Sequence, residues 1–146
     1  MACLFAVAAS SALAVSHRPA GPRYSGHTNQ VSRDVSIRVS RRRTAVVRFQ
    51  IGWDASCAHA TPFGASTDVV RSLHIRRSGA FKSHGHYSIA LPDGSSANVT
   101  ASLSGRFVSS DAARGVFSAV VVTVDRGNHL LDQCQTGAIR WIALQE

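Results

Sequence analysis

The chain has 146 residues, of which 45% are hydrophobic and 16% are charged. This length allows one domain with a sizeable core, and the hydrophobic content excludes a chain that is disordered by composition. Sixteen basic residues against eight acidic ones give a net charge of +8, and every basic residue except Lys82 is arginine. This balance indicates an anionic partner, although a GC-rich genome, whose codons favour arginine, would explain the same composition.

The chain begins with an apolar stretch over residues 1–14 that contains no charged side chain. Ala12-Leu13-Ala14 has the small-x-small pattern of a cleavage site, so we predict a secretory signal peptide over 1–14. The run is too short to span a bilayer, and we expect the mature chain to be soluble and secreted, either extracellular or associated with the cell envelope. A flexible leader over 15–23 and a single β domain over 24–146 are expected to follow.

Removal of the signal peptide takes away Cys3 and leaves two cysteines, Cys57 and Cys134. In an oxidising compartment, two cysteines most simply form one disulfide. The alternatives are metal ligation and a catalytic thiol. A metal site would need further ligands, and neither cysteine lies in a C-x-x-C motif.

Alternating apolar and polar residues predict short strands along the first half of the domain. We expect the first strand at 24–28, followed by a hairpin whose arms at 35–39 and 45–53 flank an arginine turn. In the second arm, the inward residues are predicted to be Ala45, Val47, Phe49 and Ile51. Residues 54–68 contain Pro62 and Gly64 and are predicted to be a long loop held at Cys57.

The second half continues the same pattern. A strand is predicted at 69–75, short strands at 81–91 with an interruption at 83–85, a long hairpin at 99–124, a polar loop at 125–135 and a last strand at 137–144. About eight short strands without a persistent helical period predict an all-β fold, either an antiparallel β-sandwich or a small closed β-barrel. Pairing of the first strand with the last would close it.

Several short motifs of this chain resemble motifs found in a known group of proteins. The domain opens with Tyr24-Ser25-Gly26-x-Thr28-x-Gln30 and closes with Cys134-x-Thr136-Gly137-x-x-x-Trp141-x-Ala143, with G-x-F at 105–107 and at 115–117. These motifs resemble small secreted β-domain proteins of high-GC bacteria, although Asn29 stands where serine is usual. The group has no assigned activity, so the resemblance implies the fold and secretion and no catalytic residue.

The motif residues suit structural roles. A glycine before an aromatic residue in a strand permits a bend or leaves room for a ring over the backbone. We expect Trp141 to be buried near the disulfide.

The arginines are the strongest binding candidates. If the ends of two predicted hairpins are neighbours, their guanidinium groups would form one basic face able to bind phosphate or uronate groups. The candidates for this face are Arg38, Arg41, Arg42, Arg43, Arg48, Arg71, Arg76 and Arg77. Trp53 and Tyr87 are the candidate carbohydrate contacts, and partial burial at a strand end is their alternative.

His84 and His86 are the candidate metal ligands, because residues two apart on a strand share a face. A site would need further ligands, such as His59, His74 or His129, brought there by folding. Motifs typical of hydrolases, such as G-x-S-x-G and H-E-x-x-H, are absent from the sequence.

The sequence therefore predicts a secreted, non-catalytic binding module for an anionic polymer of the cell envelope or extracellular space. We expect a monomer without a cofactor and without a specific nucleic-acid ligand, since aromatic side chains for base stacking fall at core positions. A small secreted enzyme or a metal-binding protein that uses loop histidines is the alternative.

Overall fold

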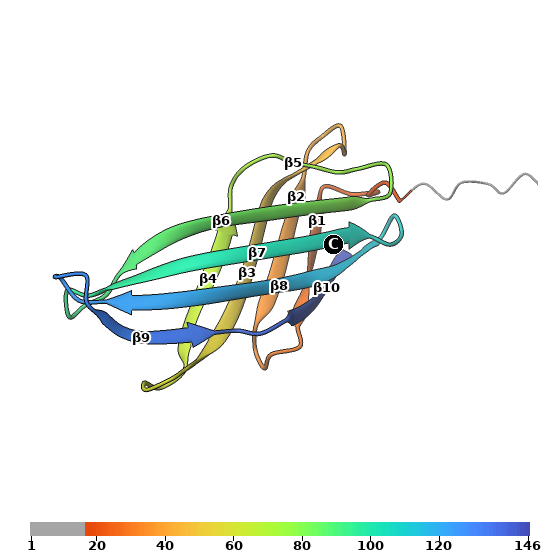
Figure 1. Ribbon diagram of the computed structural model, residues 1–146. Helices are drawn as coiled ribbons and strands as arrows, with labels where there is room; N and C mark the ends of the chain where they lie inside the picture. Colours follow the sequence, from red (N-terminus) through yellow and green to blue (C-terminus); the bar gives the residue numbers. More distant parts are fainter. Residues whose placement is uncertain (1–16) are drawn as a thin grey trace, which may run out of the picture.

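The computed structural model describes residues 17–146, so the predicted signal peptide and Cys3 lie outside the described residues. The described part of the chain contains strands and no helix (Figure 1). The strands are β1 (Arg23–Thr28), β2 (Asp34–Val39), β3 (Ala45–Cys57), β4 (Phe63–Val69), β5 (Leu73–His74), β6 (Ala80–Ala90), β7 (Ser96–Phe107), β8 (Ala112–Val124), β9 (Leu130–Gln135) and β10 (Ile139–Gln145). Within residues 17–146, no helix is long and apolar enough to cross a membrane.

Six antiparallel strands close into a barrel in the order β1, β2, β3, β9, β8 and β10, with β10 pairing again with β1. Four strands extend it: β4 and β5 pair with β3, while β7 pairs with β8 and β6 with β7. Figure 1 shows the long strands β6, β7 and β8 as a front layer that crosses β1 to β4 behind it. The predicted all-β class and the pairing of the first strand with the last are confirmed.

The core lies between these two layers and follows the two-residue alternation of the strands. On β7, every second residue from Ala97 to Phe107 is buried, and the residues between them face solvent. The bulkiest buried side chains include Trp53, Tyr24, Phe49, Phe107 and Phe117.

One row of paired residues crosses four strands of the front layer and fixes their register. Phe81 of β6 pairs with Gly105 of β7, Gly105 pairs with Gly115 of β8, and Gly115 pairs with Trp141 of β10. The rings of Phe81 and Trp141 lie 6.2 Å apart and occupy the space beside the two glycines. A Cβ atom would lie 2.8 Å from Trp141 Cζ2 at Gly105 and 2.5 Å from it at Gly115. The glycines therefore leave room for a ring, as the sequence predicts.

Trp141 does not lie beside the disulfide. It pairs with Gly115, whereas Cys134 pairs with Val121, six residues further along β8. Six residues of extended strand span about 20 Å. The paired glycines provide the space for the indole ring, and this space is at the opposite end of β8 from the cysteines.

A β-bulge at the start of β3 changes which residues face the core, compared with the prediction. Arg38 pairs with Arg48, but the next residue of β2, Val39, pairs with Val46, so Val47 is an extra residue. An extra residue reverses the alternation. Val46 is therefore buried and Val47 is only half-buried, opposite to the prediction.

Several predicted loops are strands. Residues 54–68 are mostly the paired ends of β3 and β4, and only 58–62 connect them. Exposed residues alternate with buried ones such as Ala55 and Thr67, and Gly64 is tolerated because β4 pairs on one side only. Residues 83–85 continue β6, since Ser83 and Gly85 keep their pairing with β7.

Two further predicted boundaries change. The predicted strand at 69–75 is reduced to the end of β4 and the two-residue β5. Most of the predicted loop at 125–135 is β9, whose pattern is inverted because Leu130 and Leu131 are exposed while Asp132 is buried. Residues 17–22, part of the predicted leader, lie against the barrel, with Pro19 buried and Ala20 N donating to Ser110 O.

Candidate functional site

The core row also determines where four basic side chains point. Successive residues of a strand face opposite sides of a sheet, so the sequence neighbours of a buried residue face outward. Each residue of the row has a basic neighbour, and all four are exposed on the outer face of the front layer. These neighbours are Lys82, Arg106, Arg114 and Arg140.

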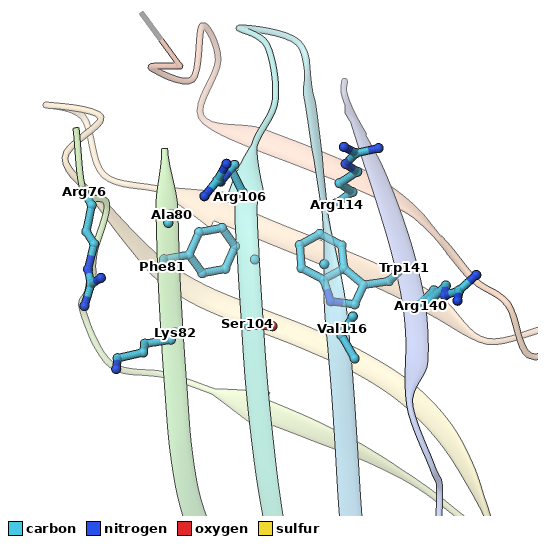
Figure 2. A pocket seen from close by; sticks show the side chains of 12 residues that line it. Arg76, Ala80, Phe81, Lys82, Ser104, Arg106, Arg114, Val116, Arg140 and Trp141 are labelled. Atoms are coloured by element: carbon cyan, nitrogen blue, oxygen red, sulfur yellow. The ribbon is translucent and has the colours of Figure 1, made fainter. Parts of the chain in front are cut away.

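These four side chains and Arg76, from the turn before β6, surround a groove of about 580 Å³ (Figure 2). Ala80, Ser104 and Val116 lie between them, with the paired glycines and the rings of Phe81 and Trp141 beneath. Both rings are only 3% exposed. The groove thus has a small-residue and apolar floor and a basic rim.

The charges of the groove are not neutralised within the described part of the chain. None of the five basic side chains forms an ion pair there, and no carboxylate lines the groove. Arg106 and Arg114 also lie directly opposite each other on β7 and β8. Like charges in this arrangement destabilise a sheet, so the arrangement favours a site for a bound anion.

Two arginines of the back layer show a contrast. Arg33 forms an ion pair with Asp54, and Arg48 forms one with Asp68. The hydrogen bond from Arg33 lowers the pKa of Asp54, and the hydrogen bonds to the carboxylates raise the pKa of Arg33 and of Arg48. These arginines already have internal counter-charges.

Only one of the predicted arginines lines the groove. The two predicted hairpin ends are neighbours, because Ile75 N donates to Thr44 O across 2.8 Å. Arg41, Arg42 and Arg43 therefore lie close to the turn that carries Arg76 and Arg77, yet of these five only Arg76 lines the groove. Arg38 and Arg48 lie on the back layer, and Arg71 lies at the gap between β4 and β6.

The predicted aromatic contacts have other environments. Trp53 is completely buried, and its Nε1 donates to Thr67 Oγ1 across 2.9 Å, so it cannot contact carbohydrate on the surface. Its position in the inward–outward alternation of β3 places its side chain in the core. Tyr87 is half-buried, and its hydroxyl lies 2.7 Å from Thr67 Oγ1. Burial is the main cause that raises the pKa of Tyr87, against the lowering effect of its hydrogen bond with Thr67.

His84 and His86 share the outer face of β6, as their spacing predicts, and His84 Nδ1 lies 2.8 Å from Ser102 Oγ. Within residues 17–146, the only cluster with metal-ligand geometry consists of Cys57, Asp132 and Cys134. Its two sulfur atoms form a disulfide, so it is not a metal site. None of His59, His74 and His129 joins a cluster with His84 and His86.

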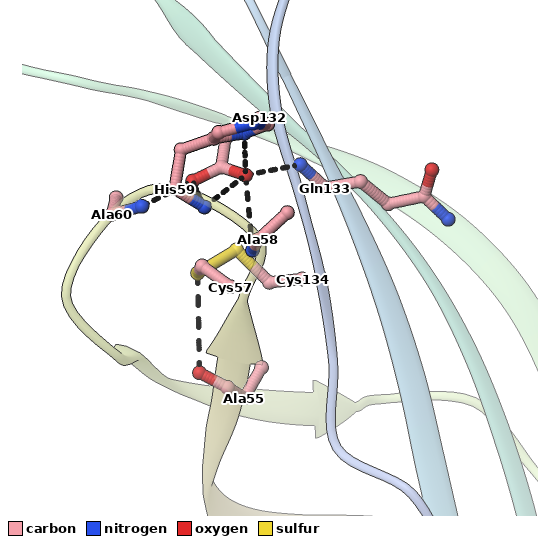
Figure 3. Close-up of a disulfide and its surroundings, with 8 residues drawn as sticks. All are labelled: Ala55, Cys57, Ala58, His59, Ala60, Asp132, Gln133 and Cys134. Atoms are coloured by element: carbon pink, nitrogen blue, oxygen red, sulfur yellow. Dashed lines mark hydrogen bonds and ion pairs between the residues drawn. A yellow bond between two sulfur atoms is a disulfide. The ribbon is translucent and has the colours of Figure 1, made fainter.

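The Cys57–Cys134 disulfide links β3 to β9, as predicted (Figure 3). Beside it, the buried carboxylate of Asp132 accepts backbone N–H groups from Ala58, His59, Ala60 and Gln133. Desolvation raises the pKa of Asp132, but these hydrogen bonds together outweigh it and leave the pKa lowered. The disulfide is consistent with an extracellular protein.

Lys82, Arg106, Arg114 and Arg140 were missed at the sequence level. The signal that could have found them is their position, since each adjoins Phe81, one of the two glycines or Trp141. That signal becomes useful only when the four strands are known to be paired. The pairing of β8 with β10 joins residues that are distant in the chain.

No family model, curated protein or solved structure matches the chain.

Proposed function

We propose that this protein is a secreted, non-catalytic binding module whose basic groove holds an anionic polymer of the cell envelope or extracellular space. The observation that carries this proposal is the group of five basic side chains around one groove, none of which forms an ion pair within residues 17–146. Four of them are arginines, whose planar guanidinium groups form bidentate hydrogen bonds with carboxylate, phosphate or sulfate groups.

The spacing of the cations favours a polymer over a single small anion. Lys82 and Arg140 end one row of paired residues that passes through Ser104 and Val116. Three gaps between neighbouring strands separate the two ends, which is about 14 Å. Arg106 and Arg114 lie between them, two residues after Ser104 on β7 and two residues before Val116 on β8. A chain with several acidic groups can contact all four side chains at once.

The floor of the groove argues against single-stranded nucleic acid as the ligand. Such ligands stack their bases on exposed aromatic rings. The two rings beneath this groove are almost completely buried. Carboxylated or phosphorylated saccharide polymers need no such rings when basic side chains hold their acidic groups.

The test is calorimetric titration of the secreted protein with polygalacturonate, and with neutral dextran as the control polymer. The groove variant combines Arg106→Thr, Arg114→Thr and Arg140→Thr. The matched control combines Arg41→Thr, Arg42→Thr and Arg77→Thr, which removes the same charge from exposed turn positions.

We expect polygalacturonate to bind, and the affinity to fall when the salt concentration rises from about 50 to about 300 mM. The groove variant should lose most of this affinity, whereas the turn variant should keep most of it. If both variants lost the same affinity for polygalacturonate, the binding would depend on net charge alone, and this would contradict the proposal. Equal binding of dextran, or no binding of the acidic polymer, would also contradict it.

A further inference from the structure

A second cavity, open to solvent, lies at the gap between the edge strands β4 and β6. These strands belong to different layers and do not pair with each other. The cavity has a volume of about 260 Å³, and its walls are mainly apolar. The apolar walls are Phe49, Val69, Val70, Tyr87, Ala101, Leu103 and Phe117. It shares no lining residue with the basic groove.

Two small residues create this space. Gly85 of β6 pairs with Ala101 of β7, and both lie on the inward side of the front layer. A Cβ atom added at Gly85 would meet no other atom within 4 Å. A larger side chain at Gly85 would therefore occupy part of this cavity.

Two polar bridges span the gap in front of the cavity. Arg71 Nη2 donates to Ser83 Oγ at 2.7 Å and to His84 O at 2.9 Å. Thr67 Oγ1 and the Tyr87 hydroxyl lie 2.7 Å apart. Residues of both bridges also line the cavity. The cavity therefore combines an apolar interior with a cationic group at its mouth.

The charge of Arg71 is free for an anionic ligand. Among the described residues, Arg71 forms no ion pair. The cavity also contains Asp68, but that carboxylate is already paired with Arg48. An acid that enters the cavity can thus exchange the neutral partners of Arg71 for a charge-assisted contact.

We propose that this cavity binds a small monocarboxylate with an apolar body, such as an aryl- or alkyl-carboxylic acid, whose carboxylate is held by Arg71. A cavity of about 150 Å³ holds benzene, so a body of about ten heavy atoms suits this larger one. The ring or alkyl chain lies beside Gly85, against the accessible side chains of Val69, Val70 and Tyr87. This site is separate from the polymer groove.

The test is calorimetric titration with 3-phenylpropanoate and with its neutral analogue, 3-phenylpropanamide. Gly85→Val places a branched side chain in the cavity at a position where an added Cβ atom meets no other atom within 4 Å. Arg71→Gln removes the charge at the mouth. Arg77→Gln, at an exposed turn residue that does not line the cavity, is the matched control.

We expect the acid to bind more tightly than the amide. Arg71→Gln should lower the affinity for the acid by about tenfold or more, and Gly85→Val should abolish binding of the acid. Arg77→Gln should leave the affinity unchanged. The proposal is overturned if the wild-type protein does not bind the acid, or if the amide binds equally well. It is also overturned if Gly85→Val retains binding, or if the groove variant described above loses it.

Discussion

Gly105 and Gly115 lie opposite each other on β7 and β8, and the rings of Phe81 and Trp141 fill the space that larger side chains would occupy. A side chain at either glycine would push the indole away from its place beside Phe49, whose ring centroid is 5.3 Å away. The same row holds the neighbouring Arg106 and Arg114 on the outer face. Packing beneath the groove and charge above it therefore depend on the same positions.

The first prediction concerns Gly115. Gly115→Ala places a Cβ atom 2.5 Å from Trp141 Cζ2 and also against the backbone oxygen of Ser104. Overpacking of this kind costs about 1–3 kcal/mol of the free energy of unfolding, measured by denaturant titration. Gly85→Ala, in an open part of β6, is the control and should be neutral or slightly stabilising. Equal losses for both variants would refute the role of the ring.

The second prediction concerns pH and Asp132. Its pKa is lowered in the folded state, so its ionised form stabilises the fold at neutral pH. This stabilisation is lost as the pH falls through the lowered pKa and the carboxyl group is protonated. Asp132→Asn should lower stability at neutral pH and make the stability less dependent on pH in the acidic range.

Unfolding titrations at several pH values between about 3 and 7 check this. Other aspartates with lowered pKa values, such as Asp54 and Asp93, contribute to the same acid limb. The difference between wild type and Asp132→Asn isolates the contribution of Asp132. Parallel curves for the two proteins would count against this role of the carboxylate.

At the scale of elements, the long alternating strands were predictable and the irregular ones were not. The hairpin of β7 and β8 was predicted from the G-x-F motif on each of its arms, and the structure shows that the two glycines of these motifs pair. The burial of Val46 in place of Val47 results from the bulge, which the alternation of the sequence does not reveal. The strand β9 buries Asp132 and exposes Leu130, because backbone N–H groups of a distant loop satisfy the carboxylate.

The third prediction concerns the attachment of β9. The disulfide joins cysteines 77 residues apart and ties the end of β3 to β9. In the chain-entropy treatment, a disulfide that closes a loop of this length stabilises the folded state by about 4 kcal/mol. The double variant Cys57→Ser and Cys134→Ser should lose about that much stability by denaturant titration. Unchanged stability, with the disulfide verified in the wild-type protein by mass spectrometry, would refute this contribution.

At the scale of the whole molecule, some arginines have a counter-charge and others have none, and the back layer holds both kinds, since Arg38 forms no ion pair among the described residues. Arg33 and Arg48 on the back layer are paired with aspartates, whereas the basic residues around the groove have no such partners within the described residues. The sequence shows an excess of arginine but not which arginines have a counter-charge. Arg140 joins the groove only through the pairing of β8 with β10, which local patterns do not specify. Of the arginines predicted to form a basic face, only Arg76 lines the groove.

The most direct test locates the bound polymer on the protein. Backbone amide NMR spectra of the labelled protein would be recorded before and after addition of short polygalacturonate chains. We predict that the largest shifts fall on the outer face of β6, β7, β8 and β10, around Lys82, Arg106 and Arg140. Shifts confined to the turn at 40–44, or spread evenly over both layers, would contradict the assignment of the groove as the binding site.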